Sequence, residues 1–191
     1  MQNLQQIRSF IAIPISDELR NAIKKLLLEL RPIHGNVKWI DPDSVHLTLK
    51  FLGNISILQV EQISLILKKA VLGISSFKLR TGDKGAFPSL KKPRVYWIGI
   101  DEMEDNRLVC IQKKIEGELT KIGFESEGRK FKPHLTIGRV RDYKNIQQVN
   151  DTFIAYNFPT VEFNVQNIFL MKSELTPKGA IYSVQNSVKL S

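Results

Sequence analysis

Residues 46–49 read His-Leu-Thr-Leu, and residues 134–137 read His-Leu-Thr-Ile, 88 positions further along the chain. Two of the three histidines in the sequence open these two copies. Apolar residues alternate with polar ones in both, which predicts β-strands whose side chains point to opposite faces in turn. Each histidine then shares a face with a threonine, while the aliphatic residues face a core. The repeat predicts two half-sites that face each other across a groove.

Strict alternation also assigns the other residues near each histidine to one face of its strand. Lys50 falls on the face of His46, whereas Phe51 falls on the opposite face with the leucines. Lys132 shares the face of His134. Arg139 falls on the opposite face, unless Gly138 introduces a β-bulge that turns it.

The rest of the chain mixes helical and strand patterns. Strands are expected at 7–15, 37–40, 45–52, 77–87, 94–100, 131–137, 161–172 and 180–188, and helices at about 17–30, 57–71, 105–122 and 145–155. This mixture predicts an α+β fold with antiparallel sheets. The spacing of the two copies suggests a duplication in which each half supplies one sheet. No Pro-, Gly- or Ser-rich linker divides the chain, so residues 1–191 are expected to form a single domain.

Composition narrows the class of protein. The chain has 191 residues, of which 42% are hydrophobic, and a formal net charge of +9, which favours polyanionic partners. One cysteine, Cys110, excludes a disulfide framework and a thiolate metal cluster. The apolar run at 10–13 is broken by Pro14 and is too short for a signal core or a membrane span. A cytoplasmic protein without membrane association is therefore expected.

Two histidines at one phosphorus atom can divide acid and base roles. One imidazole takes a proton from the attacking oxygen, and the other gives a proton to the leaving oxygen. The two threonine hydroxyls can donate hydrogen bonds to phosphate oxygens and stabilise the charge of the transition state. The residues alone leave open which histidine is the acid. His34 lies in a turn with Pro32 and Gly35 and is expected at the surface.

The motifs and their flanks resemble those of a known family. His46-Leu-Thr-Leu-Lys-Phe-Leu-Gly53 and Phe131-Lys-Pro-His-Leu-Thr-Ile-Gly-Arg139 are similar to the paired motifs of the 2H phosphoesterase superfamily. Within it, the chain resembles the RNA 2′,3′-cyclic phosphodiesterases, historically called 2′-5′ RNA ligases. Further similar segments are Arg8–Ile13, Gly85–Pro88, Arg94–Trp97 and Ser173–Gly179 with Tyr182.

This resemblance implies a bilobal α+β fold with two pseudo-symmetric lobes, each with an antiparallel sheet and flanking helices, around a central cleft. It implies hydrolysis of an RNA 2′,3′-cyclic phosphate to a 2′-phosphate. The two histidines and two hydroxyls need no metal for this, and we expect a monomer without a cofactor. By the same resemblance, His46 is the proton donor and His134 the proton acceptor, while Thr48, Thr136 and Arg139 bind phosphate. Candidate RNA contacts are Lys50, Lys132, Phe51, Phe87, Trp39 and Tyr182.

Other activities are compatible with the same motifs. A 2H phosphoesterase can act on a 2′-5′ linkage or a small cyclic nucleotide, or can run the ligation in reverse. A non-catalytic RNA-binding module would use the basic cleft only for capture. Binding alone does not require two histidines in matched half-sites, which favours an enzyme.

Overall fold

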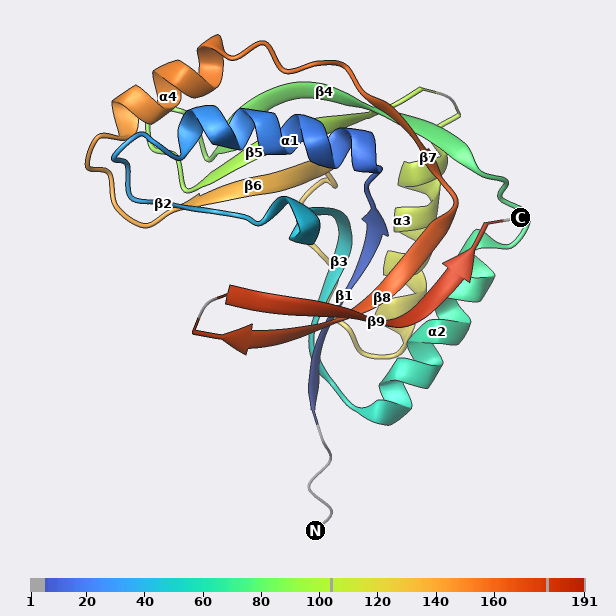
Figure 1. Ribbon diagram of the computed structural model, residues 1–191. Coiled ribbons are helices and arrows are strands. Elements are labelled where there is room, and N and C mark those ends of the chain that lie inside the picture. The colour runs from blue at the N-terminus through green and yellow to red at the C-terminus, as the bar shows by residue number, and fades with distance from the viewer. Residues whose placement is uncertain (1–5, 104, 178, 191) are drawn as a thin grey trace.

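The computed structural model describes residues 6–103, 105–177 and 179–190, and within them the chain forms an antiparallel sheet with four α-helices and one 3₁₀ helix (Figure 1). The expected α+β class is confirmed. In chain order the elements are β1 (Ile7–Pro14), α1 (Asp17–Leu30), β2 (Val37–Trp39), η1 (Pro42–Ser44), β3 (His46–Ile55), α2 (Ile57–Val71), β4 (Phe77–Phe87), β5 (Val95–Glu102), α3 (Arg107–Lys121), β6 (His134–Val140), α4 (Ile146–Ala155), β7 (Glu162–Val165), β8 (Asn167–Thr176) and β9 (Gly179–Lys189).

The sheet consists of two halves that meet at one point. Its strand order is β7-β4-β5-β6-β3-β1-β8-β9, and β2 pairs with β6. Between β6 and β3 the only registered pair in the described residues is Leu47 with Leu135, which occupy the same position in the two sequence copies. A local two-fold axis therefore passes between these leucines. We call β3, β1, β8 and β9 the first half-sheet, and β6, β5, β4, β7 and β2 the second.

Each half-sheet draws strands from both halves of the chain, which the sequence did not lead us to expect. Strand β4 follows β3 and α2 but pairs with β5 in the second half-sheet, and β8 returns to pair with β1 in the first. The helices divide in the same way. Helices α2 and α3 contact each other beside the first half-sheet, and α1 contacts α4 in the upper part of Figure 1. The exchanged strands tie the two lobes into one core.

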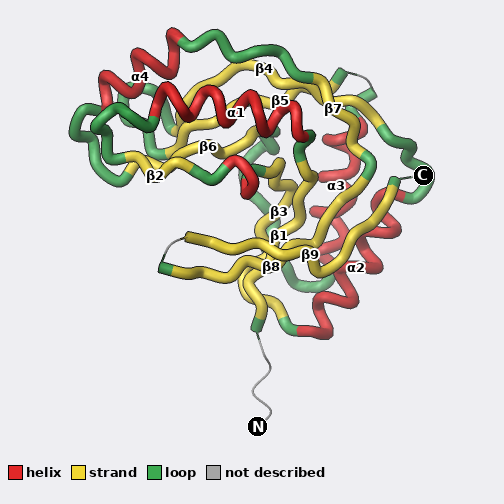
Figure 2. The backbone as a smooth tube through the Cα atoms, in the orientation of Figure 1, coloured by secondary structure: helices red, strands yellow, loops and turns green. Residues whose placement is uncertain are grey.

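The exchange also explains why the segment expected as one strand, 161–172, is divided. Strand β7 pairs with β4, whereas β8 pairs with β1, so the chain changes half-sheet at Gln166. The expected loop at 173–179 is also largely strand, because β8 runs on to Thr176 and β9 starts at Gly179. Together β8 and β9 form a long hairpin whose turn points away from α2 and α3 (Figure 2).

Local hydrogen bonds and one glycine set the helix ends. The side chains of Ser16 and Ser56 accept hydrogen bonds from the backbone N–H three residues on, and so cap α1 and α2. Gln59 completes a capping box with Ser56. Gly123 follows α3 with φ of +92°, which favours glycine. No helix in the described part of the chain is long and apolar enough to cross a membrane.

Candidate active site

The two His-x-Thr motifs lie side by side where the half-sheets meet. Leu47 and Leu135 pair across β3 and β6 and are fully buried. Because side chains alternate along a strand, the flanking His and Thr residues point to the opposite face. Continuing the antiparallel register by one residue on each side brings His46 beside Thr136, and Thr48 beside His134. The structure thus brings all four expected residues together.

The two imidazoles are oriented by equivalent backbone bonds. His46 Nδ1 lies 2.8 Å from the carbonyl oxygen of Ser44, and His134 Nδ1 lies 2.7 Å from the carbonyl oxygen of Lys132. A carbonyl oxygen only accepts, so Nδ1 carries the hydrogen in both rings. The free atom in each ring is therefore Nε2, which can accept a proton or, when charged, donate one.

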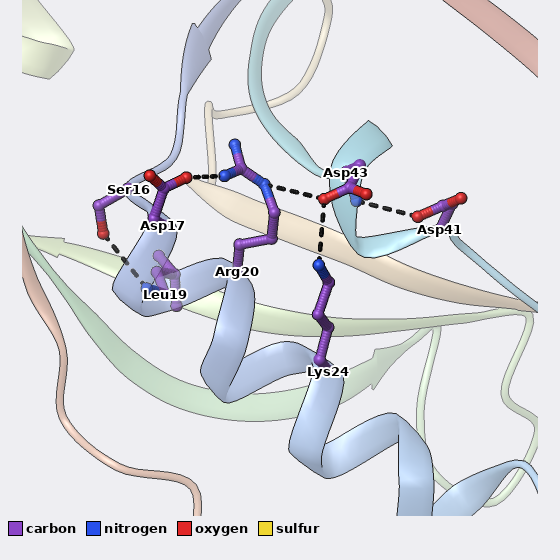
Figure 3. Close-up of polar contacts among 7 residues, drawn as sticks. All are labelled: Ser16, Asp17, Leu19, Arg20, Lys24, Asp41 and Asp43. Atoms are coloured by element: carbon purple, nitrogen blue, oxygen red, sulfur yellow. Dashed lines mark hydrogen bonds and ion pairs between the residues drawn. The ribbon is translucent and has the colours of Figure 1, made fainter.

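A polar network fixes the segment that leads into His46 (Figure 3). Arg20 and Lys24 of α1 each reach Asp43 of η1, with nitrogen–oxygen distances of 3.4 Å. Arg20 also pairs with Asp17 at the start of the helix. The Asp41 side chain accepts from the Asp43 backbone N–H at 3.0 Å. These contacts hold η1, which ends at the residue whose carbonyl orients His46. The sequence showed η1 only as turn chemistry.

The surroundings of His46 are aromatic. Phe10 stacks on its ring with centroids 4.6 Å apart and an interplanar angle of 25°. Tyr182 meets the same ring edge-on at 5.2 Å. Burial lowers the pKa of His46 below its ordinary value, and the hydrogen bond with Ser44 offsets this in part. Tyr182, expected as a base-stacking residue, therefore packs on the ring of His46.

His134 has a different neighbourhood. Phe87 meets its ring edge-on at 5.0 Å and lies 5.2 Å from the indole of Trp97. Trp97 pairs with Thr136 across β5 and β6, so its side chain is on the same face as the motif. Phe87, another candidate RNA contact, thus lies at the site. No stacked ring comparable to Phe10 lies on His134 among the described contacts. The two motifs match in sequence but differ in their surroundings.

Equivalent bulges then interrupt both motif strands. The register of β3 against β1 shifts at Leu49, and that of β6 against β5 shifts at Ile137, the same position in the second copy. Each bulge places two consecutive residues toward the core and reverses the alternation beyond it. Arg139 is consequently exposed and lines the groove with His46. The bulge required to turn Arg139 toward the histidines is present.

The bulge in β3 overturns two expectations. Phe51 lies on the histidine face instead of the core face; it is 58% exposed and lines the same groove. Lys50 is 5% exposed, and its Nζ donates to Glu116 Oε1 at 2.8 Å and to the Glu125 carbonyl at 2.7 Å. The prediction that Lys50 contacts RNA was wrong, because its ammonium is buried against α3. Alternation along β3 alone does not show this bulge, because the bulge depends on the register of β3 against the neighbouring strand β1.

A groove of about 1100 Å³ runs from this site over the first half-sheet. His46, Phe51, Arg139, Trp39 and Tyr182 are among its lining residues. Thr48, His134 and Thr136 are not among them; Thr48 belongs to β3, whereas His134 and Thr136 belong to β6 and pair with β5. Lys132 is exposed next to His134, so its contact with RNA remains a prediction. His34 is exposed, as expected. In the described residues, no three His, Cys, Asp or Glu side chains gather at a metal-binding distance.

Known structures share this fold. A protein from Thermus thermophilus superposes with a TM-score of 0.79 at 24% identity, over 96% of this chain and 98% of that one. Escherichia coli LigT complexed with 3′-AMP superposes with a TM-score of 0.77 at 23% identity, over 98% and 99% of the two chains. The fold and the paired motifs define a two-lobed 2H phosphoesterase.

Sequence comparison gives the family. The family model described as LigT like Phosphoesterase matches the chain twice, over residues 13–97 and 98–182, which agrees with the expected duplication. Two relatives named RNA 2′,3′-cyclic phosphodiesterase are each 34% identical. The one from Methanocaldococcus jannaschii aligns over 93% of this chain and 98% of its own. The one from Archaeoglobus fulgidus aligns over 92% and 96%. The chain belongs to the LigT-like phosphoesterase family.

Proposed function

We propose that this protein hydrolyses the 2′,3′-cyclic phosphate at an RNA end to a 2′-phosphate, without a metal ion. The observation that carries the proposal is the pair of imidazoles, each with Nδ1 bonded to the carbonyl two residues upstream and Nε2 free. Relatives named for this activity align over nearly the whole chain. The basic net charge of +9 suits a polyanionic substrate.

In the proposed reaction, a water oxygen attacks phosphorus while His134 Nε2 accepts its proton. The bond from phosphorus to O3′ breaks, and His46 Nε2 donates its proton to O3′. The phosphate remains on O2′, and the two histidines end in exchanged protonation states that solvent resets. Hydroxyls of Thr48 and Thr136 donate to the non-bridging oxygens, and the Arg139 guanidinium neutralises their charge.

The lowered pKa of His46 has a consequence for this assignment. A proton donor must enter the reaction charged, and burial disfavours the charged ring in the free protein. An anionic phosphate beside the ring stabilises the imidazolium, so substrate binding raises the pKa of His46. We expect a bell-shaped dependence of kcat on pH, whose alkaline limb reports proton loss from His46 in the substrate complex.

The test uses a short RNA with a 2′,3′-cyclic phosphate and identifies the position of phosphate in the product. Release of a 2′-phosphate supports the proposal, and a 3′-phosphate or no reaction contradicts it. His46→Ala and His134→Ala should each lower kcat/KM by about 10²–10⁴-fold or more. His34→Ala is the matched control, because His34 is exposed and outside the site. An equal loss of activity in His34→Ala would contradict a specific role for His46 and His134.

Both histidines come from one chain, so we propose that a monomer is sufficient for the reaction. Turnover per chain should then stay constant as the protein is diluted. A fall in turnover per chain on dilution, together with dissociation in sedimentation, would show that a second copy is required.

A further inference from the structure

The carbonyl groups that orient the two motif histidines are held in different ways. The carbonyl of Lys132, which faces His134 Nδ1, comes directly before Pro133. A proline restricts the residue before it to extended conformations, so the chain itself sets the direction of the Lys132 carbonyl. The carbonyl of Pro133 in turn accepts from the Ile100 backbone N–H at 3.1 Å. The acceptor of His134 is therefore fixed by a proline and by strand β5.

The carbonyl of Ser44, which faces His46 Nδ1, is followed by Val45 and not by a proline. It closes η1, a 3₁₀ helix of only three residues. The Ser44 backbone N–H donates to the Asp41 carbonyl at 2.8 Å, which makes a single tight turn. A helix this short is not stable by itself in water. The direction of the Ser44 carbonyl therefore depends on what η1 contacts.

Arg20 of α1 supplies such a contact through Asp43 (Figure 3). Arg20 Nε lies 3.4 Å from Asp43 Oδ1, is buried, and has no hydrogen-bond partner among the described residues. The Asp43 carboxylate is therefore the group that compensates the charge on this side of the guanidinium. Lys24 lies 3.4 Å from the same oxygen, but its side chain is 48% exposed against 25% for Arg20. Solvent weakens the Lys24 contact more than the Arg20 contact.

Helix α1 gives Arg20 a fixed position. The buried side chains of this helix are Leu19, Ala22, Ile23, Leu26, Leu27 and Leu30. Arg20 follows Leu19, which is fully buried, so its backbone cannot shift without disturbing the core. In η1 only Pro42 is buried. The contact between Arg20 and Asp43 therefore holds a short exposed turn against a helix of the core.

We propose that Arg20, acting through Asp43 and the Ser44 carbonyl, is a positioning residue for His46. Its kinetic consequences rest on the proposed function. With the Ser44 carbonyl in place, Nδ1 keeps the hydrogen and Nε2 is presented to the leaving oxygen. Without that carbonyl, the ring can rotate, and the hydrogen of the neutral ring is free to move to Nε2. Among the described residues no ion pair involves residues 131–134, so His134 has no equivalent of Arg20.

The first experiment measures the imidazole ¹⁵N chemical shifts of the free protein, which report the nitrogen that carries the hydrogen. The chain has only three histidines, so each ring can be assigned. At a pH where the rings are neutral, Arg20→Met and Asp43→Asn should both move His46 toward the form with hydrogen on Nε2 and leave His134 unchanged. Asp43 is 68% exposed, so Asp43→Asn tests the contact even where Arg20→Met fails to fold. Unchanged His46 shifts in both variants reject the positioning role, whether or not the protein hydrolyses a cyclic phosphate.

The second experiment measures kcat against pH on a cyclic-phosphate RNA. The direct effects of the two lost charges on the pKa of His46 have opposite signs, because Arg20→Met removes a positive charge and Asp43→Asn a negative one. Loss of the Ser44 hydrogen bond lowers this pKa in both variants, so a positioning role moves the alkaline limb to lower pH in both. The other charged or titratable groups that line the groove with His46 are the same in every variant: Arg8, Lys38, Asp41, Arg139 and Tyr182. Shifts of opposite sign contradict the proposal.

The size of the effect and a control complete the test. We expect kcat to fall about 10–100-fold with KM nearly unchanged, since a displacement of about 1 Å at a reacting group can cost about 10²-fold. The double variant should lose no more than either single variant, because both remove one contact. Lys25→Met is the control and should behave as wild type, since Lys25 is exposed on α1 and outside the groove lining. A change confined to KM, losses that multiply in the double variant, or an equal loss in Lys25→Met overturns the proposal.

Discussion

Replacing Lys50 by Met tests the buried ion pair that the bulge in β3 creates. The side chains of Lys50 and Glu116 are 5% and 16% exposed, and their charged atoms are 2.8 Å apart. Without Lys50, Glu116 Oε1 keeps only the Glu127 backbone N–H, and Glu116 Oε2 has no hydrogen-bond partner. Breaking a buried pair from one side costs about 3–5 kcal/mol, because the remaining charge stays desolvated.

The Lys50 ammonium has a second role that adds to this cost. It donates to the Glu125 carbonyl, and Glu116 accepts from the Glu127 N–H, so the pair holds the loop between α3 and β6. That loop leads to His134. We therefore expect Lys50→Met to lower kcat as well as the free energy of unfolding, without changing the salt slope of RNA binding.

Urea denaturation of four proteins gives the energy: the wild type, Lys50→Met, Glu116→Gln and the double variant. A loss of about 3–5 kcal/mol in the first variant lowers the melting temperature by about 6–20 °C for a chain of this size. The double variant should recover part of the loss, since no charge is left unpaired. Lys121→Met is the matched control, because Lys121 pairs with Glu118 on the exposed side of α3, and removal of this solvent-exposed pair should leave the stability nearly unchanged. The reasoning fails if Lys50→Met lowers the free energy of unfolding no more than that control does. It also fails if Lys50→Met weakens RNA binding and reduces its salt slope.

Three further predictions concern the core and the conditions of activity. Because the pKa of His46 is lowered in the folded protein, the unfolded chain binds more protons below about pH 6.5, and the free energy of unfolding should decline as pH falls from there. This decline should be smaller in His46→Gln. Equal shifts of the urea midpoint with pH in both proteins contradict this prediction. Tyr96→Phe should cost about 1–3 kcal/mol, because the hydroxyl donates to Asn150 Oδ1 at 2.5 Å and that oxygen would stay buried without a partner; thermal melting measures it, and a neutral result refutes it. Prolonged treatment with a chelator should leave hydrolysis of a cyclic-phosphate RNA unchanged, and loss of activity restored by one added metal would reverse the conclusion.

The fold was predictable where local signals agree with the final structure. The apolar spacing predicted α1 and α2, and the alternation in both motifs predicted the buried Leu47 and Leu135. The exchange of β4 and β8 between the half-sheets was not predictable. The sequences of β4 and β8 do not indicate which strand each of them pairs with, because pairing depends on contacts between residues far apart in the chain.

The candidate site shows the same limit on a smaller scale. Alternation placed His46 with Thr48 correctly but exchanged the positions of Lys50 and Phe51. A bulge is a property of two strands, so the sequence of β3 alone does not contain it. In the second copy Gly138 occupies the position of Lys50, and a Cβ there would meet the Trp39 ring at 2.5 Å. The same bulge thus occurs in both copies of the motif, but the residue that it buries packs against different partners, α3 for Lys50 and Trp39 for Gly138.

The meeting point of β3 and β6 has a consequence for how the enzyme is aligned. Elsewhere the sheet is held by ladders of several residue pairs, but the two motif strands share one registered pair in the described residues, Leu47 with Leu135. The packing of these two aliphatic side chains therefore contributes to the spacing of the two imidazoles, together with the backbone ladders that join β3 to β1 and β6 to β5. Trimming either leucine by a methyl group offers a way to adjust the distance between acid and base while the scaffold around them stays intact.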